Sequence, residues 1–187
     1  MGQAKLSLPF GTESMLARVV RILSEVVSPI VVVAAVGQDI PSLSPEVIIA
    51  RDDQEGLGPL AGLAIGLSML PTDVTAAYAS GCDVPLLKPG FIRLMIDSLG
   101  DHQLVIPRDG KYYHPLAAVY RSELADRARE LVTAGRLRPV FLVDECDSRM
   151  IDVEELRRVD PRLDSLQNVN TPEAYEHALQ GAGLSHE

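Results

Sequence analysis

Short apolar runs alternate with longer stretches of helical periodicity along the whole chain, and this alternation narrows the possible folds more than any other feature. Ile30–Ala35 is apolar throughout and has the length of a buried strand. Before it, apolar residues recur at helical spacing between Met15 and Val26, with Thr12 as a candidate cap. Strand and helix patterns in this order are typical of an α/β fold with a mostly parallel sheet.

The rest of the sequence continues the alternation. We expect further strands at 47–50, 74–80, 103–107 and 116–120, and further helices at 60–70, 89–100, 122–135 and from 172 onward. Val140–Val143 fits either a strand or the start of a buried helix. No linker, internal repeat or low-complexity segment interrupts the pattern, so residues 1–187 are predicted to form one domain.

Charge and composition exclude several classes of protein. The net charge of -9 argues against broad nucleic-acid binding and against an anionic membrane surface, because both require clustered Lys and Arg. Cys82 and Cys146 are the only cysteines, too few for a disulfide framework or a four-cysteine zinc site. The sequence shows no signal peptide and no apolar run that would span a bilayer, so we expect a cytoplasmic protein.

Asp83 is the strongest candidate for chemistry. It follows directly on an expected strand, at the position where open α/β sheets bind ligands. Magnesium is commonly held by one or two carboxylates together with substrate phosphates. The alternative is an Asp that caps a backbone N–H in a strand-to-helix turn.

A glycine-rich turn, Gly56–Gly62, forms the second candidate site. It enters a helix through Gly58, Pro59 and Leu60, so backbone N–H groups of the helix start would face a ligand. Asp52 and Asp53 stand just before it and suit a sugar or a base. Both features also have ordinary explanations, since glycine-rich turns serve helix packing and loop carboxylates are commonly solvated.

The third candidate comprises Asn168 and Asn170, which flank a valine at strand spacing and therefore face the same way. Their amide groups suit a hard cation, a phosphate or a sugar, but equally an Asx turn with a helix cap. His114 stands between a turn and a strand, where a lone histidine is more often structural than catalytic.

In this order, the segments resemble the molybdenum cofactor guanylyltransferase family. The matching segments are Met1–Lys5, Asp52–Gly62, Gly81–Pro85, Asp109–Gly110, His114–Ala117 and Asn168–Glu173. The resemblance covers nearly the whole chain. It implies a Rossmann-like, three-layer nucleotidyltransferase fold and transfer of GMP from GTP to molybdopterin or molybdenum cofactor, with release of pyrophosphate.

The resemblance also implies roles for individual residues. Asp83 would hold magnesium, with manganese as an alternative, and Lys5 would neutralise charge on the phosphates. Asp52 and the Gly58–Leu60 turn would bind the nucleotide. The acceptor side, or the surroundings of the metal, would contain His114, Asn168 and Asn170.

The sequence departs from the family pattern in two places. The family's Gly-rich loop, Leu-Ala-Gly-Gly-x-Ser-x-Arg, and the central strand before it are absent, so we expect exposed apolar neighbours and slow catalysis by this form. Ala34 stands where the family often has an Asn near the base. Guanylyl transfer is the first reading; the alternatives are a cytidylyltransferase or related nucleotidyltransferase, and a non-catalytic nucleotide-binding relative.

Overall fold

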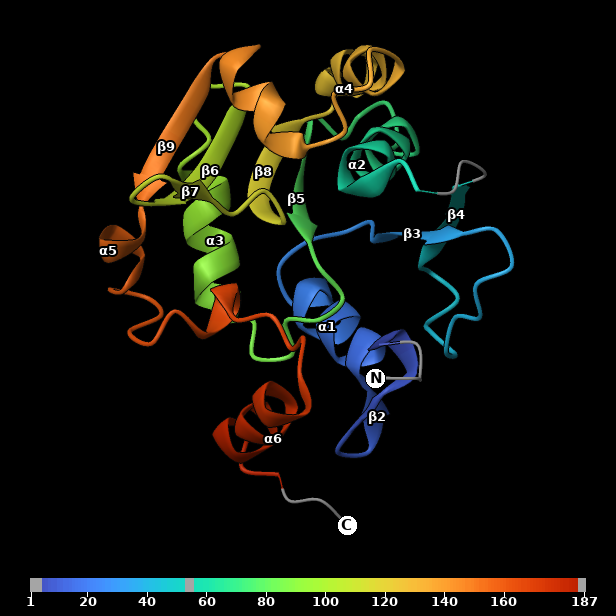
Figure 1. Ribbon diagram of the computed structural model, residues 1–187, viewed down its shortest axis with the longest axis vertical. Helices are drawn as coiled ribbons and strands as arrows, with labels where there is room; N and C mark the ends of the chain where they lie inside the picture. Colours follow the sequence, from blue (N-terminus) through green and yellow to red (C-terminus); the bar gives the residue numbers. More distant parts are fainter. Residues whose placement is uncertain (1–4, 53–55, 185–187) are drawn as a thin grey trace.

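The computed structural model describes residues 5–52 and 56–184, and these form an α/β fold with helices on both faces of the strands (Figure 1). The first half contains η1 (Lys5–Ser7), β1 (Pro9–Phe10), β2 (Glu13–Ser14), α1 (Met15–Ser24), β3 (Val31–Ala35), β4 (Ile48–Asp52), α2 (Gly58–Ser68), β5 (Ala76–Ser80) and α3 (Pro89–Asp97). The second half contains β6 (Leu104–Asp109), β7 (Tyr112–Tyr113), β8 (Ala117–Arg121), α4 (Leu124–Thr133), η2 (Pro139–Asp144), β9 (Ser148–Asp152), α5 (Val153–Leu156), η3 (Asp164–Leu166) and α6 (Pro172–Gly181).

The sheet is mixed, so the prediction of a mostly parallel sheet is confirmed only in part. Parallel pairing occurs between β3 and β4 and between β6 and β9. In contrast, β8 runs antiparallel to both β5 and β6, and β6 and β7 form a hairpin. Strand direction depends on the chain's three-dimensional path, and apolar periodicity within a strand carries no information about it.

Apolar side chains cover both faces of the strands and produce the three predicted layers. One core contains residues of α2 and α4 packed on β6 and β8, including Leu60 and Tyr120. On the opposite face, residues of α3 pack on β6 and β8, and α1 packs against α3. Each strand residue therefore contacts one layer or the other by alternation along the strand.

The described strands divide into separate sheets between β3 and β5. In the described part of the chain, β3 pairs only with β4, and β5 pairs only with β8. Between the two unpaired edges lies a cavity of about 690 Å³. Residues of β3 and β5 line this cavity, among them Val31–Val33 and Tyr78, and these are only partly buried.

Most expected elements lie within a few residues of their predicted positions, with one correction. Ser14, rather than Thr12, caps α1, and its Oγ accepts a hydrogen bond from the N–H of Ala17 at 3.2 Å. Val140–Val143 belongs to η2, so the helical alternative was correct. Thr171 caps α6 through a 3.2 Å hydrogen bond from the N–H of Ala174.

Candidate functional site

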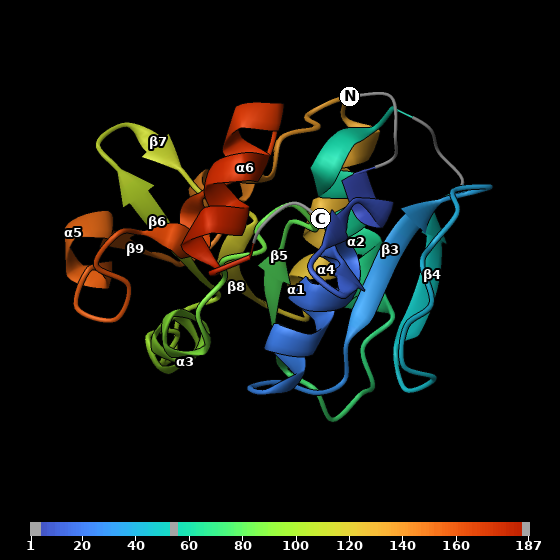
Figure 2. The ribbon, with the colours of Figure 1, turned by 90° about the horizontal axis from the view of Figure 1, so that it is seen from below.

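The carboxyl ends of the parallel strands β3 and β4 lie beside the amino end of α2 at one edge of the molecule (Figure 2). A pocket of about 280 Å³ lies at this edge. Its lining consists of Val33, Ala34, Ala35, Gln38, Asp52, Gly56, Leu57, Gly58 and Gly62. The predicted residues Asp52 and Gly58 therefore share one pocket, and Ala34 lies in its wall.

The helix start at Gly58 is shaped for an anionic ligand. Gly58 has a φ of +71°, which a side chain would strain, and Pro59 occupies the first turn of α2. The N-cap residue is Leu57, whose side chain makes no capping hydrogen bond. The partial positive charge of the helix start is therefore directed at the pocket, and the N-cap side chain does not neutralise it. Leu60 is fully buried in the core, so only its backbone can serve the predicted nucleotide site.

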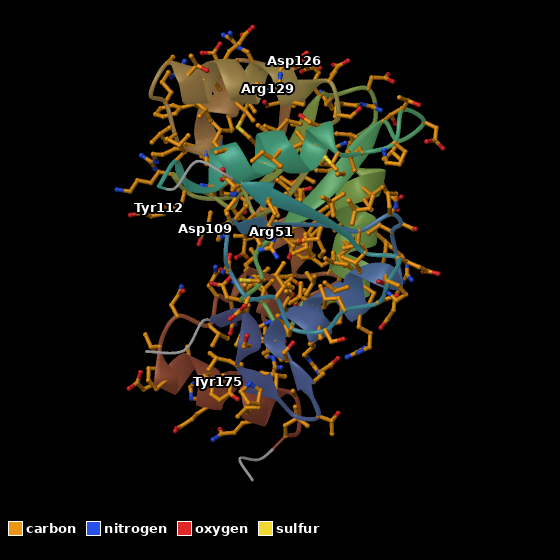
Figure 3. The ribbon with its side chains drawn as sticks, turned by 90° about the vertical axis from the view of Figure 1, so that its right-hand side faces the viewer. Arg51, Asp109, Tyr112, Asp126, Arg129 and Tyr175 are labelled. Atoms are coloured by element: carbon orange, nitrogen blue, oxygen red, sulfur yellow. The ribbon has the colours of Figure 1, made fainter. Side chains whose placement is uncertain are left out.

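Two polar side chains fix the loop that forms the pocket wall. Gln38 Oε1 accepts a hydrogen bond from the N–H of Ala35 at 3.1 Å. Arg51 Nη1 donates to the carbonyl oxygens of Ala35 and Gln38, at 3.0 and 2.8 Å. Sequence reasoning missed both residues, since no periodicity or motif distinguishes them. Figure 3 labels Arg51 on its strand, together with Asp109 and Tyr112 of the β6–β7 hairpin.

Asp83 lies in a short turn after β5, and two hydrogen bonds from the C-terminal segment hold it there. Asn168 Nδ2 donates to Asp83 Oδ1 at 3.1 Å, and the N–H of Val169 donates to the Asp83 carbonyl at 2.8 Å. Val169 is buried, whereas both flanking asparagines are exposed. The structure thus brings together two predicted residues that are 85 positions apart in the sequence.

Gly81 lies so close to the Asp83 carboxylate that a side chain at position 81 would collide with it. A Cβ built on Gly81 would lie 2.7 Å from Asp83 Oδ1, well inside any normal contact distance. A larger residue at position 81 would therefore push the carboxylate away from Asn168. The observed position of the Asp83 side chain therefore depends on glycine at position 81.

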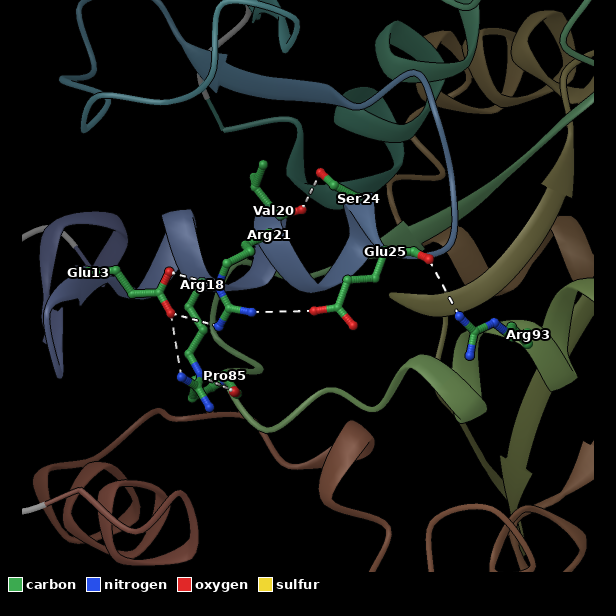
Figure 4. Close-up of polar contacts among 8 residues, drawn as sticks. All are labelled: Glu13, Arg18, Val20, Arg21, Ser24, Glu25, Pro85 and Arg93. Carbon is green, nitrogen blue, oxygen red and sulfur yellow. Dashed lines mark hydrogen bonds and ion pairs between the residues drawn. The ribbon is translucent and has the colours of Figure 1, made fainter.

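Helix α1 secures the other side of the same turn (Figure 4). Arg18 Nε donates to the carbonyl oxygen of Pro85 at 2.7 Å. Glu13 pairs with the guanidinium groups of Arg18 and Arg21, at 3.4 and 2.9 Å. The hydrogen bond from Arg21 lowers the pKa of the Glu13 carboxyl, so Glu13 stays ionised at neutral pH. The turn after β5 is thereby anchored from two directions.

The structure gives positions for most of the predicted residues, and all of their predicted roles stay predictions. His114 lies between β7 and β8, outside the lining of the 280 Å³ pocket, and burial lowers the pKa of its imidazole while the charge of Asp109 opposes this. Asn170 is exposed, two residues from the Asn168 contact. The side chain of Lys5 lies outside the described part of the structure, as does Asp53.

The described side chains alone do not complete a coordination shell for a divalent cation, so oxygen atoms of a bound nucleotide or water would have to supply the rest. Among residues 5–52 and 56–184, no three His, Cys, Asp or Glu side chains gather as a metal-binding cluster. Asp83 offers one carboxylate, a hard oxygen donor, with Asn168 beside it. Magnesium accepts this arrangement, because it usually retains few protein ligands and completes its shell with phosphate oxygens and water.

Comparison with known proteins decides the family. Residues 1–148 match the family described as MobA-like NTP transferase domain. The chain belongs to the MobA-like NTP transferase family. A "Probable molybdenum cofactor guanylyltransferase" of Mycobacterium tuberculosis H37Rv is 36% identical over 183 residues, covering 95% of this chain and 85% of the relative. A protein of the same name from Mycobacterium ulcerans is 35% identical over 175 residues, covering 90% and 81%.

Solved structures share the fold of this MobA-like chain. Molybdopterin-guanine dinucleotide biosynthesis protein A from Archaeoglobus fulgidus aligns with a TM-score of 0.77 at 20% identity, covering 97% of this chain and 92% of that one. The 2-C-methyl-D-erythritol 4-phosphate cytidylyltransferase of Thermus thermophilus aligns with a TM-score of 0.73 at 11% identity, covering 96% and 94%. The family establishes that the chain is a nucleotidyltransferase. No described helix is long and apolar enough to cross a membrane.

Proposed function

We propose that this protein transfers GMP from GTP to the phosphate of molybdopterin or molybdenum cofactor, releasing pyrophosphate. The observation that carries the proposal is the Asn168–Asp83 hydrogen bond, which fixes a carboxylate in the turn that follows β5. The mycobacterial relatives at 36% identity, named as guanylyltransferases, supply the substrate class.

The residues of the chain divide the work of binding. Asp52 and the start of α2 at Gly58 contact the nucleotide from one side of the site. Asp83 holds the divalent ion, magnesium or manganese, with Asn168 fixing the orientation of its carboxylate. Lys5 would neutralise charge on the phosphates, while His114 and Asn170 would belong to the acceptor side. When bound, the metal neutralises charge on the phosphate oxygens.

The transfer itself requires positioning more than acid–base chemistry. An oxygen of the acceptor phosphate attacks the α-phosphorus of GTP and forms a new P–O–P linkage. The bond from the α-phosphorus to the oxygen bridging to the β-phosphorus breaks, and pyrophosphate leaves with that electron pair. The attacking oxygen is already anionic, so no side chain need remove a proton. The protein's contribution is alignment and charge stabilisation.

Pyrophosphate release measured with GTP, CTP and ATP tests the proposal. Each reaction contains the 187-residue chain, magnesium and molybdopterin or molybdenum cofactor, and rates are compared among nucleotides, so slow absolute turnover does not matter. We expect release that requires the acceptor and is at least about tenfold faster with GTP. Asp83→Asn should reduce it about a hundredfold or more while leaving the thermal midpoint nearly unchanged.

Other outcomes identify the alternatives. Preference for CTP would replace guanylyl by cytidylyl transfer. Ala34 agrees with that outcome, because the family often has an Asn near the base at this position. Saturable nucleotide binding without any release of pyrophosphate would favour a non-catalytic nucleotide-binding protein. Equal rates in Asp83→Asn and the unaltered chain would remove Asp83 from the site.

A further inference from the structure

The charged side chains that the described part of the chain buries come from one short segment after α5. They are Asp160 and Asp164, and Ser165 beside them is buried as well. The same segment contains Leu163, whose φ of +55° lies in the left-handed region that a leucine seldom adopts. Buried polar groups and a left-handed leucine are both costly, so the surrounding contacts must hold this segment in one conformation.

Asp160 orders this segment from inside. Its Oδ2 accepts a hydrogen bond from the N–H of Ser165 at 2.7 Å, and its carbonyl oxygen accepts one from the N–H of Leu163 at 2.9 Å. Among the residues that the structure describes, Asp160 Oδ1 has no hydrogen-bond partner. A buried carboxylate with so few partners contributes little to stability. What the Asp160 side chain contributes is a fixed position for the backbone of Ser165.

The next two residues hold Lys88, which stands at the start of α3 and ends the turn after β5. Ser165 Oγ accepts a hydrogen bond from the backbone N–H of Lys88 at 3.0 Å. Asp164 Oδ2 lies 3.2 Å from Lys88 Nζ, and Arg162 Nη2 donates to the same oxygen at 2.9 Å. Both the backbone and the side chain of Lys88 are therefore bound by one segment.

Residues 83–88 and 165–169 form a closed ring of two chain segments. The contact of Ser165 just described is one junction of the ring. At the other junction, the N–H of Val169 donates to the carbonyl oxygen of Asp83 at 2.8 Å. Each segment is thus attached to the other at both of its ends, and neither can shift without breaking a junction.

The ring matters because the contact between Asn168 and Asp83 cannot fix itself. Asn168 is exposed and Asp83 is only half-buried, so water competes for their side-chain hydrogen bond. The geometry of such a pair depends on how firmly the two backbones are held. The junction at Ser165 is buried and shielded from water, so it can supply that restraint.

We propose that Asp160 and Ser165 are positioning residues for the Asp83 carboxylate. Asp160 fixes Ser165, Ser165 fixes the end of the turn at Lys88, and the ring transmits this restraint to Asp83. Neither positioning residue touches the reacting atoms. The proposal rests on the proposed function, in which Asp83 holds the metal, because groups that orient a metal ligand strengthen metal binding and speed the reaction.

Amide exchange in Ser165→Ala provides the first test, because this substitution removes the buried junction. The readout is the exchange rate of the Val169 N–H divided by that of Val119, which lies in β8 between two paired strands and reports on global stability. We expect the ratio to rise at least about tenfold. Ser148→Ala is the matched control, since Ser148 Oγ donates to the carbonyl of Val143 at 3.1 Å, outside the ring. An unchanged ratio in Ser165→Ala, or an equal rise in the control, would overturn the proposal.

Two substitutions of Asp160 test its part in the ring. Asp160→Asn keeps an oxygen that accepts from the N–H of Ser165 and removes the buried charge, whereas Asp160→Ala removes the acceptor. We expect the exchange ratio to stay within about threefold of the unaltered chain in Asp160→Asn and to rise at least about tenfold in Asp160→Ala. Equal ratios in the two variants would show that the contact with Ser165 does not order the ring. If Asp160→Ala does not fold, Ser165→Ala still decides.

The magnesium requirement separates positioning from mere stability. In the pyrophosphate assay, we expect the half-saturating magnesium concentration to rise at least about fivefold in Ser165→Ala and to stay unchanged in Ser148→Ala. A purely structural role of Ser165 would lower the amount of folded enzyme without changing this concentration, and that result would overturn the proposal. Absence of pyrophosphate release from the unaltered chain would instead contradict the proposed function. The exchange ratios use no nucleotide, so the two failures are distinguishable.

Discussion

At the scale of single residues, the position of the Asp83 carboxylate depends on the absence of a side chain at Gly81. Gly81→Ala would place a methyl group 2.7 Å from Oδ1, and the tip of Asp83 can rotate away at little cost to the fold. We expect turnover to fall at least about tenfold while the thermal midpoint shifts by no more than about 2 °C.

Gly90→Ala is the matched control for that substitution. Gly90 lies in the first turn of α3, where an added Cβ would meet Val159 at an ordinary 3.8 Å. It should leave turnover unchanged. Equal activity of the two variants would show that the Asp83–Asn168 geometry is not needed for the reaction.

His114 makes a prediction about pH. Burial lowers the pKa of its imidazole in the folded protein below the ordinary value of 6.5, so the unfolded chain binds the proton more tightly. The stabilisation by neutral His114 is complete above about pH 6.5 and is lost as the pH falls through the folded-state pKa. Urea unfolding of the wild-type chain and His114→Gln between about pH 5 and pH 8 checks this.

The variant should show a shallower loss of stability on acidification than the wild-type chain. Identical slopes would mean that His114 does not titrate differently in the folded and unfolded states. This measurement concerns folding alone and leaves the acceptor-side role of His114 to activity assays.

At the scale of elements, the start of α1 distinguishes two neighbouring hydroxyl residues. Ser14 caps the helix through its hydrogen bond to Ala17, whereas Thr12 lies in the turn between β1 and β2. Ser14→Ala should cost about 1 kcal/mol of unfolding free energy, measured by urea denaturation, and Thr12→Ala should cost little. A larger loss from Thr12→Ala would restore the prediction made from the sequence.

Elements with a strong apolar pattern were predictable, and elements with a mixed pattern were not. The strand β3 is a continuous apolar run, and its predicted and observed bounds differ by one residue. By contrast, β9 contains Ser148, Arg149 and Asp152 and went unrecognised, because it forms the parallel edge partner of β6 with Met150 exposed. Edge strands carry polar residues that hide their periodicity.

At the scale of the whole molecule, residue types could be assigned to candidate sites but their distances could not. The sequence indicated Asp83 and Asn168 separately, and the resemblance placed them in one site. Their contact across 85 positions, and the anchoring of the turn by Arg18, are set by the chain's path through the fold. The antiparallel course of β8 is non-local in the same way, and the sequence did not predict it.

The central claim is that GTP binds at the sheet edge between Asp52 and Asp83, through a divalent ion held by Asp83. Calorimetric titration of the chain and of Asp83→Asn with GTP, CTP and ATP, each with and without magnesium, tests it most directly. The account predicts that GTP binds most tightly, that magnesium strengthens the binding, and that Asp83→Asn abolishes the magnesium effect. Tighter binding of CTP, or an undiminished magnesium effect in Asp83→Asn, would contradict it.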